Sequence, residues 1–124
     1  MSSVGATFVE ELRTRYGDGL RAVVTYDRDG YEVQYLGEEA DRNYSVADID
    51  AIYDDIVLHE IAHDFQEALF DDMGEIEGKL RLFEDGTVAH FWPEDDETGV
   101  FVGFDDSVDP GVRELLGLAT DYYA

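Results

Sequence analysis

Helical and strand-like spacings of apolar residues alternate along the chain. Near the start, apolar positions recur at helical spacing over residues 8–12. Thr7, followed three residues later by Glu10, has the spacing of a capping box and indicates a helix that begins at Thr7. Glycines 17 and 19 favour its end. The first element is therefore predicted to be a short helix.

A β-hairpin is expected next. Residues 20–26 are rich in β-branched side chains, and residues 31–36 alternate between apolar and polar positions. The two runs flank Asp29-Gly30, a dipeptide typical of a tight turn between antiparallel strands. The charged stretch 37–43 that follows is expected to be a loop.

A long central helix is predicted over residues 46–70, which contain neither glycine nor proline. Ser45, with Asp48 three residues later, marks its start. Its first and second halves carry apolar faces that are rotated by more than a quarter-turn. Such a helix has two surfaces to cover, the sheet and a second subunit, unless a bend separates the halves. The first-half residues expected to face the sheet or a partner are Ile49, Ile52, Tyr53 and Ile56.

Three further strand-like runs, 76–83, 87–92 and 99–104, precede a C-terminal helix that begins near Asp109-Pro110. The element order is α-β-β-α-β-β-β-α. Tight hairpin connections imply an antiparallel sheet. The sequence thus predicts one α+β domain over residues 1–124, with about five strands and helices packed on the sheet.

This order resembles the profilin-like fold of the Roadblock/LC7 proteins. The matching features are the hairpin at residues 26–31, the long central helix and the turn at residues 83–88. Proteins of that family are generally dimers that pair through their central helices and edge strands, and they scaffold or regulate small GTPases and motor complexes. The resemblance implies a homodimeric, non-enzymatic interaction or regulatory module.

The charge of the chain changes the expected setting more than the expected fold. Its 124 residues include 31 acidic and 8 basic ones, for a net charge of -23, and the acidic residues are spread over the whole length. Lys79 is the only lysine. A dispersed acidic coat is typical of cytoplasmic proteins of extreme halophiles, whose self-repulsion is screened in molar salt. The fold is therefore expected to loosen below ~0.5 M salt.

The same composition excludes several classes of partner and site. Direct DNA or RNA binding is not expected, because it needs basic groups that displace phosphate counterions. No apolar run approaches the ~18 residues of a membrane span, so no membrane partner is expected. The sequence has no cysteine, which excludes disulfides and thiolate metal sites.

One motif carries possible catalytic chemistry. His59-Glu60-Ile61-Ala62-His63 matches H-E-x-x-H, in which His59 and His63 share a helix face and can bind Zn²⁺ while Glu60 acts as general base. A minimal zinc hydrolase is therefore the alternative function. Against it, Asp64 is charged and no Gly-x-x-His continuation follows, so a solvated or partner-facing helix face without cofactor is favoured. Candidate third zinc ligands are Asp71, Asp72, Glu75, Glu77 and His90.

Two other clusters have a structural and a functional interpretation. The aromatic cluster (His90, Phe91, Trp92, Phe101 and Phe104) is interpreted as core or dimer contact rather than as a ligand patch. The carboxylate cluster at 95–97 and 105–106 is interpreted as solvated surface rather than as a Ca²⁺ or Mg²⁺ site. A small-ligand binding module of the same broad fold is a third possibility, for which no residue stands out.

Overall fold

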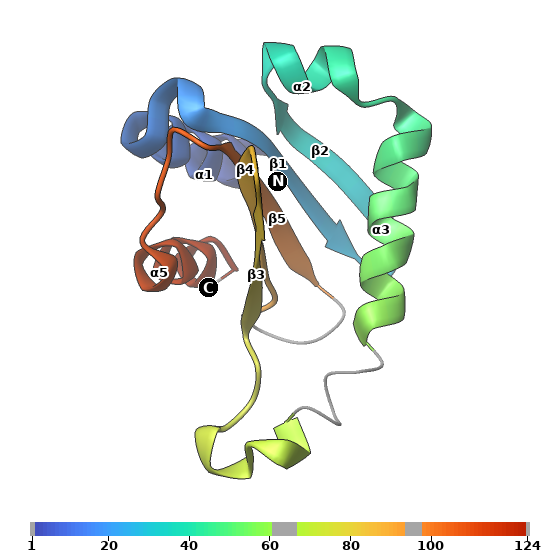
Figure 1. Cartoon of the computed structure of the whole chain (residues 1–124), viewed down its shortest axis with the longest axis vertical. Coiled ribbons are helices and arrows are strands. Elements are labelled where there is room, and N and C mark those ends of the chain that lie inside the picture. Colours follow the sequence, from blue (N-terminus) through green and yellow to red (C-terminus); the bar gives the residue numbers. More distant parts are fainter. Residues whose placement is uncertain (1, 61–66, 94–97, 124) are drawn as a thin grey trace.

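The computed structural model describes residues 2–60, 67–93 and 98–123. Five strands form one sheet, and the main helices lie on its two faces (Figure 1). The elements are α1 Ser2–Tyr16, β1 Leu20–Asp27, β2 Gly30–Leu36, α2 Glu38–Asn43, α3 Val46–Glu60, β3 Gly78–Phe83, β4 Gly86–Phe91, β5 Gly99–Asp105 and α5 Val112–Tyr123, with 3₁₀ turns at Gly17–Gly19 and Asp71–Met73.

All strand pairs in the sheet are antiparallel, in the order β2-β1-β5-β4-β3. The predicted α+β class and the antiparallel five-stranded sheet are confirmed. Two strands, β2 and β3, form the edges, and β3 follows the segment that returns from α3. The chain thus pairs β1 with the last strand, β5, which brings its two halves together in one sheet.

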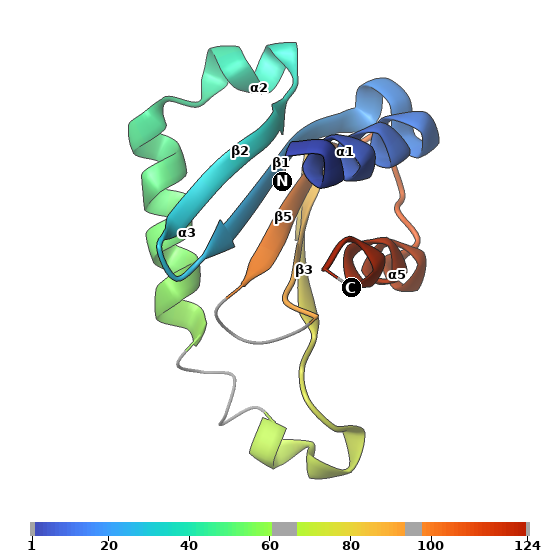
Figure 2. The same ribbon diagram turned by 180° about the vertical axis from the view of Figure 1, so that it is seen from behind.

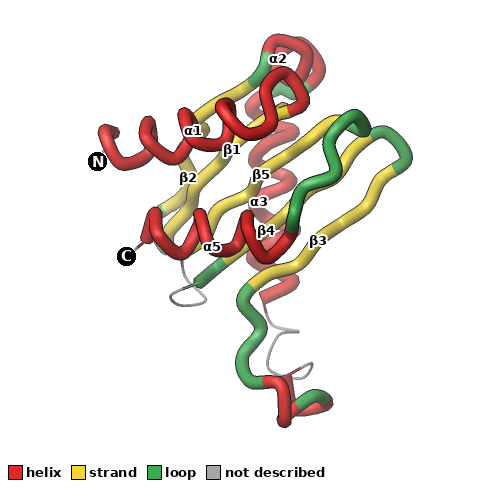
Figure 3. The backbone as a smooth tube through the Cα atoms, turned by 90° about the vertical axis from the view of Figure 1, so that its left-hand side faces the viewer, coloured by secondary structure: helices red, strands yellow, loops and turns green. Residues whose placement is uncertain are grey.

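The two faces of the sheet are covered by different helices. Helices α1 and α5 lie side by side on one face, and α3 lies on the other, as Figure 2 shows from behind and Figure 3 from the side. The hydrophobic core lies between the sheet and the α1–α5 pair. Strand residues Val23, Val102 and Phe104 meet Leu12 and Leu115 there, and each is at most 1% exposed.

The start of α3 agrees with the sequence prediction. The Ser45 N–H donates to Asp48 Oδ2 at 2.9 Å, and the Asp48 N–H donates to Ser45 Oγ at 3.2 Å. This reciprocal pair satisfies two backbone donors that the helix itself cannot use. The hydrogen bonds donated to the Asp48 carboxylate, first from the Ser45 backbone, lower its pKa below the ordinary value.

Two local predictions were wrong. Helix α1 begins at Ser2 and not at Thr7, so it includes Gly5, and Phe8 and Leu12 anchor its following turns in the core. Residues 37–43 are not a loop, since α2 forms there. Ala40, only 2% exposed, anchors this short helix against the protein.

The predicted central helix is described in part. Residues 46–60 form α3, and residues 67–69 are helical. Residues 61–66 lie outside the described part, so a continuous helix over 46–70 stays a prediction. Among the described residues, none of the helices combines the length and hydropathy needed to cross a bilayer.

Candidate interaction surface

A groove lies between α3 and the sheet face that α1 and α5 do not cover. Its volume is about 660 Å³, and its walls come from all five strands and from α2 and α3. Its apolar lining includes Ala22, Val24, Val88, Ile49 and Ile52. The groove exists because α3 does not pack closely on this face, whereas α1 and α5 bury theirs.

Strand pairing sets which side chains lie next to one another on the groove floor. Lys79 pairs with His90, His90 with Phe101, and Phe101 with Val24, so these four residues form one row across β3, β4, β5 and β1. Opposed residues of antiparallel strands point to the same face. The row therefore places the lysine at the β3 edge and apolar groups toward the middle of the sheet.

A second row runs parallel to the first. Arg81 pairs with Val88, Val88 with Gly103, and Gly103 with Ala22. A Cβ atom added at Gly103 would find its nearest neighbour, the Ala22 backbone nitrogen, at 3.9 Å. The groove floor at Gly103 is therefore open enough to accept a side chain.

Polar contacts hold α3 over the groove from two sides. The Tyr31 hydroxyl donates to Asp50 Oδ1 at 2.5 Å, and the Tyr53 hydroxyl donates to the Asp27 carbonyl at 3.3 Å. From the opposite side, Arg81 Nη1 on β3 lies 3.2 Å from Asp55 Oδ2 on α3. The helix is therefore tied to the β1–β2 hairpin and to the edge strand.

Three basic residues line the groove of this strongly acidic protein, together with Glu84 and Asp85 near the end of β3. Arg21, Lys79 and Arg81 line it, three of the eight basic residues of the chain. Burial lowers the pKa of Lys79, and the neighbouring Arg81 lowers it further. From the sequence alone, these basic residues do not stand out as a site. The available signal was the only lysine two positions from an arginine on one strand, which places both on the same face.

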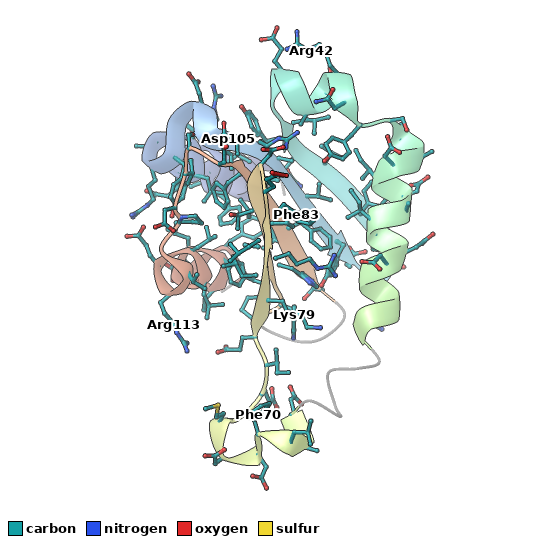
Figure 4. All side chains as sticks on the ribbon, viewed as in Figure 1. Arg42, Phe70, Lys79, Phe83, Asp105 and Arg113 are labelled. Atoms are coloured by element: carbon teal, nitrogen blue, oxygen red, sulfur yellow. The ribbon has the colours of Figure 1, made fainter. Side chains whose placement is uncertain are left out.

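Strand β3 is an exposed edge with apolar side chains on both faces. Leu80 and Leu82 are 37% and 79% exposed, and Phe83 is 58% exposed. An edge strand has backbone N–H and C=O groups that no neighbouring strand satisfies. Figure 4 places Phe83 on β3 and Phe70 in the segment that precedes β3. This edge can therefore accept another strand.

The predicted interface residues lie where α3 faces the sheet. Ile49, Ile52 and Tyr53 line the groove, and Ile52 is 41% exposed. The side chain of Ile56 lies outside the described part of the structure. A contact of these residues with a partner stays a prediction.

The aromatic cluster divides between the two sheet faces. Phe91 and Phe104 belong to the core under α1 and α5. His90 and Phe101 line the groove, and His90 Nε2 lies 2.5 Å from the Tyr26 hydroxyl. All five members are buried, so the interpretation as core fits their burial better than that of an exposed ligand patch.

The H-E-x-x-H motif lies mostly outside the described residues. His59 and Glu60 end α3, but their side chains are not described, and neither is His63. Among the described residues, no group of three or more histidine, aspartate or glutamate side chains could hold a metal ion. The zinc ligands His59 and His63, the base Glu60 and the candidate third ligands other than His90 stay predictions. His90 itself bonds to Tyr26 and is buried among aromatic rings.

The carboxylate cluster at residues 95–97 and 105–106 is also described only in part. Residues 95–97 lie outside the described residues. Asp105 accepts hydrogen bonds from the Ser107 N–H at 2.9 Å and from the Ser107 hydroxyl at 2.5 Å. Asp105 therefore shapes the turn after β5.

The five-stranded antiparallel sheet, with paired terminal helices on one face and a central helix on the other, defines an α+β fold of the Roadblock/LC7 type. The sequence profile described as Domain of unknown function (DUF7522) matches residues 6–124. The chain belongs to this family. No curated protein sequence matches the chain.

Solved structures with the same fold include MglB of Myxococcus xanthus. It superposes with a TM-score of 0.67 at 14% identity, over 99% of this chain and 86% of that chain. A second structure, described as MglB with a tetrameric arrangement, gives a TM-score of 0.61 at 16% identity, over 95% of this chain and 89% of that chain. At these identities the likeness establishes the fold.

Proposed function

We propose that this chain is a non-enzymatic interaction module that self-associates through β3 and the exposed face of α3, with residues 1–124 as one unit. The observation that carries the proposal is the β3 edge, where Leu82 is 79% and Phe83 58% exposed. Unprotected apolar edges promote pairing with other chains. A second strand paired with β3 would cover these apolar side chains and would account for their exposure in the single chain.

A second copy of the chain is the partner that this edge suits first. In a symmetric dimer, the same patch is used on both subunits. Antiparallel pairing of two β3 strands would bring Leu80 and Leu82 of one copy against those of the other, and would bring the two α3 helices toward one another. The solved MglB structure with a tetrameric arrangement supports self-association as a property of this fold.

A partner of another kind would then bind the dimer. Roadblock/LC7 proteins, which the fold resembles, scaffold or regulate small GTPases and motor complexes. A small GTPase is therefore the first class of partner to test. The acidic surface of the chain, at a net charge of -23, supports work in concentrated salt, as in a halophile cytoplasm.

The test of self-association is light scattering coupled to gel filtration in 2–3 M KCl. We expect a dimer for the native chain and a monomer for Leu82→Glu, because the new carboxylate would be buried in the strand contact. Val112→Glu is the matched control, since Val112 is 42% exposed on α5 and lies away from β3. This control should remain a dimer.

A native chain that is monomeric at all concentrations up to the millimolar range contradicts the proposal. So does a Leu82→Glu variant that stays dimeric with an unchanged circular dichroism spectrum, because the contact would then lie elsewhere.

A further inference from the structure

Lys79 is the only lysine of the chain, and it faces the groove between α3 and the sheet. It is partly buried on β3, and Figure 4 shows it on the side of the sheet opposite to Arg113 and α5. Among the described side chains, no carboxylate forms an ion pair with Lys79, although the sequence contains 31 acidic residues. The neighbouring Arg81 is paired with Asp55. Within the described part of the chain, Lys79 is therefore a groove cation without an ion-pair partner, whereas the guanidinium of Arg21 lies 5.8 Å from the centroid of the Tyr44 ring.

An unpaired ammonium group in a partly buried position is unfavourable without a compensating anion. Glu84 and Asp85 line the groove, but they follow the C-terminal end of β3, whereas Lys79 is near its start. The position next to Lys79 therefore has room for an anion from outside the chain.

The rest of the groove suits an apolar group. Beyond Lys79 and His90, its floor continues over Phe101, Val24 and Val88. Its volume of about 660 Å³ is in the range of small-molecule sites, which are mostly apolar with a few placed polar groups.

The contacts of α3 favour a small molecule over a peptide segment. The Tyr31–Asp50 and Tyr53–Asp27 hydrogen bonds and the Arg81–Asp55 ion pair tie the helix to the sheet on both sides of the groove. A helix or strand that entered the groove would have to break these contacts. A slender ligand would leave them in place.

We propose that this groove binds a small amphiphilic anion, with its charged end at Lys79 and its apolar body over Phe101, Val24 and Val88. Complementary charge and the apolar lining of the groove select this class of ligand. The site goes beyond the proposed self-association, because the ligand would lie between α3 and the sheet of one chain and not at the β3 edge.

The experiment uses three probes: decanoate, decanol and acetate. Binding to the full chain is measured in molar KCl by titration calorimetry and by the fluorescence of Trp92, whose ring centroid lies 4.5 Å from that of His90 in the groove. We expect saturable binding of decanoate, about ten-fold weaker binding of decanol and no binding of acetate. The apolar chain of decanoate should supply most of the binding affinity, and its carboxylate should make the groove prefer it over decanol.

Four variants distinguish the contribution of the Lys79 charge to binding from the contribution of the groove's shape. Lys79→Met keeps the apolar stem and should weaken decanoate about ten-fold, to the level of decanol, while Lys79→Arg should retain the preference. Gly103→Val should weaken decanoate and decanol together, because its side chain enters the open groove floor. Arg113→Met, on the far face of α5, removes one positive charge elsewhere and should change nothing.

The proposal is overturned if decanoate and decanol bind equally well to the native chain, or if neither binds up to millimolar concentration. It is also overturned if Lys79→Met leaves decanoate binding unchanged, or abolishes the dimer instead. Titrations repeated on Leu82→Glu distinguish the two proposals. Binding retained by a monomeric variant supports the groove site alone, and failure of the dimer test leaves this measurement valid.

Discussion

Helices bury the apolar residues of the two sheet faces to different degrees. On the face covered by α1 and α5, Val23, Val100 and Val102 have no exposed surface. On the face under α3, Ala22, Val24 and Val88 are only partly buried and line a groove. The same strands thus contribute to a closed core on one side and to an open surface on the other.

The difference comes from how the helices are attached. Helices α1 and α5 contact one another and insert large apolar residues such as Leu12 and Leu115 into the core. Among the described residues, helix α3 is held by two tyrosine hydroxyls, by ring contacts of Tyr53 with Tyr26 and Tyr31, and by the exposed Arg81–Asp55 ion pair. Apolar burial stabilises more strongly than exposed polar contacts. The closed face therefore carries the stability of the fold, and the open face is free to bind.

The largest expected effect is on the closed face. Leu115→Ala should reduce the free energy of unfolding by about 3 kcal/mol, because Leu115 is fully buried and its truncation leaves a cavity. Ile52→Ala, on the partly exposed wall of the groove, should cost under about 1 kcal/mol. Denaturant unfolding in molar KCl measures both. Equal losses would mean that α3 is packed as tightly as the core helices.

A smaller effect is expected when salt is lowered. Asp50 and Asp54 are one turn apart on α3, and Asp48 and Asp55 add to the negative charge of that helix. Weaker screening increases their repulsion, by about 1 kcal/mol in total. Hydrogen exchange of α3 amides should therefore speed up about five-fold below ~0.5 M KCl, before the amides of β5 respond. Simultaneous loss of protection in both elements would remove the distinction between the faces.

Acid should also act first on α3. The pKa of Asp48 is lower than its ordinary value of 3.8, so its capping contribution is present above that pH and is lost as the pH falls through the folded-state pKa. Asp48→Asn keeps an acceptor oxygen but does not titrate. Circular dichroism below pH 3.8 should show a loss of helicity in the native chain that is smaller in the variant. Identical titration curves would show that the cap does not control α3.

The smallest expected effect concerns the zinc content of the protein. We expect less than stoichiometric zinc by elemental analysis of untagged protein kept in molar KCl and washed briefly with a weak chelator. The favoured interpretation of His59 and His63 is a solvated or partner-facing helix face. About one zinc per chain, lost in His63→Ala, would contradict this and would bring the hydrolase alternative forward.

Much of the fold could be predicted because its signals are local. The Asp29-Gly30 turn, the Ser45–Asp48 cap and the alternation of the strands depend on residues close in sequence, and the structure has each of them. The short helix α2 was missed because Ala40, which anchors it, becomes buried only when the tertiary structure forms. The start of α1 was also misplaced, because Thr7 and Glu10 have the spacing of a local cap but the helix already begins at Ser2.

The candidate site was predicted less well than the fold. Spacing along α3 was enough to group Ile49, Ile52 and Tyr53, which share one side of the helix. It could not show that this side would lie over Lys79 and Arg81, because those residues come from β3 and reach the groove only through pairing with β4 and β5.

The sequence by itself determined the order of the five strands and of helices α1, α3 and α5, the acidic composition and the apolar face of α3, because these depend on composition and on periods of a few residues. Only the tertiary structure decided that β3 is an edge strand, that α3 leaves a groove and that Lys79 faces it without a described carboxylate partner. Those properties depend on contacts between residues far apart in the chain, and local spacing carries no information about them.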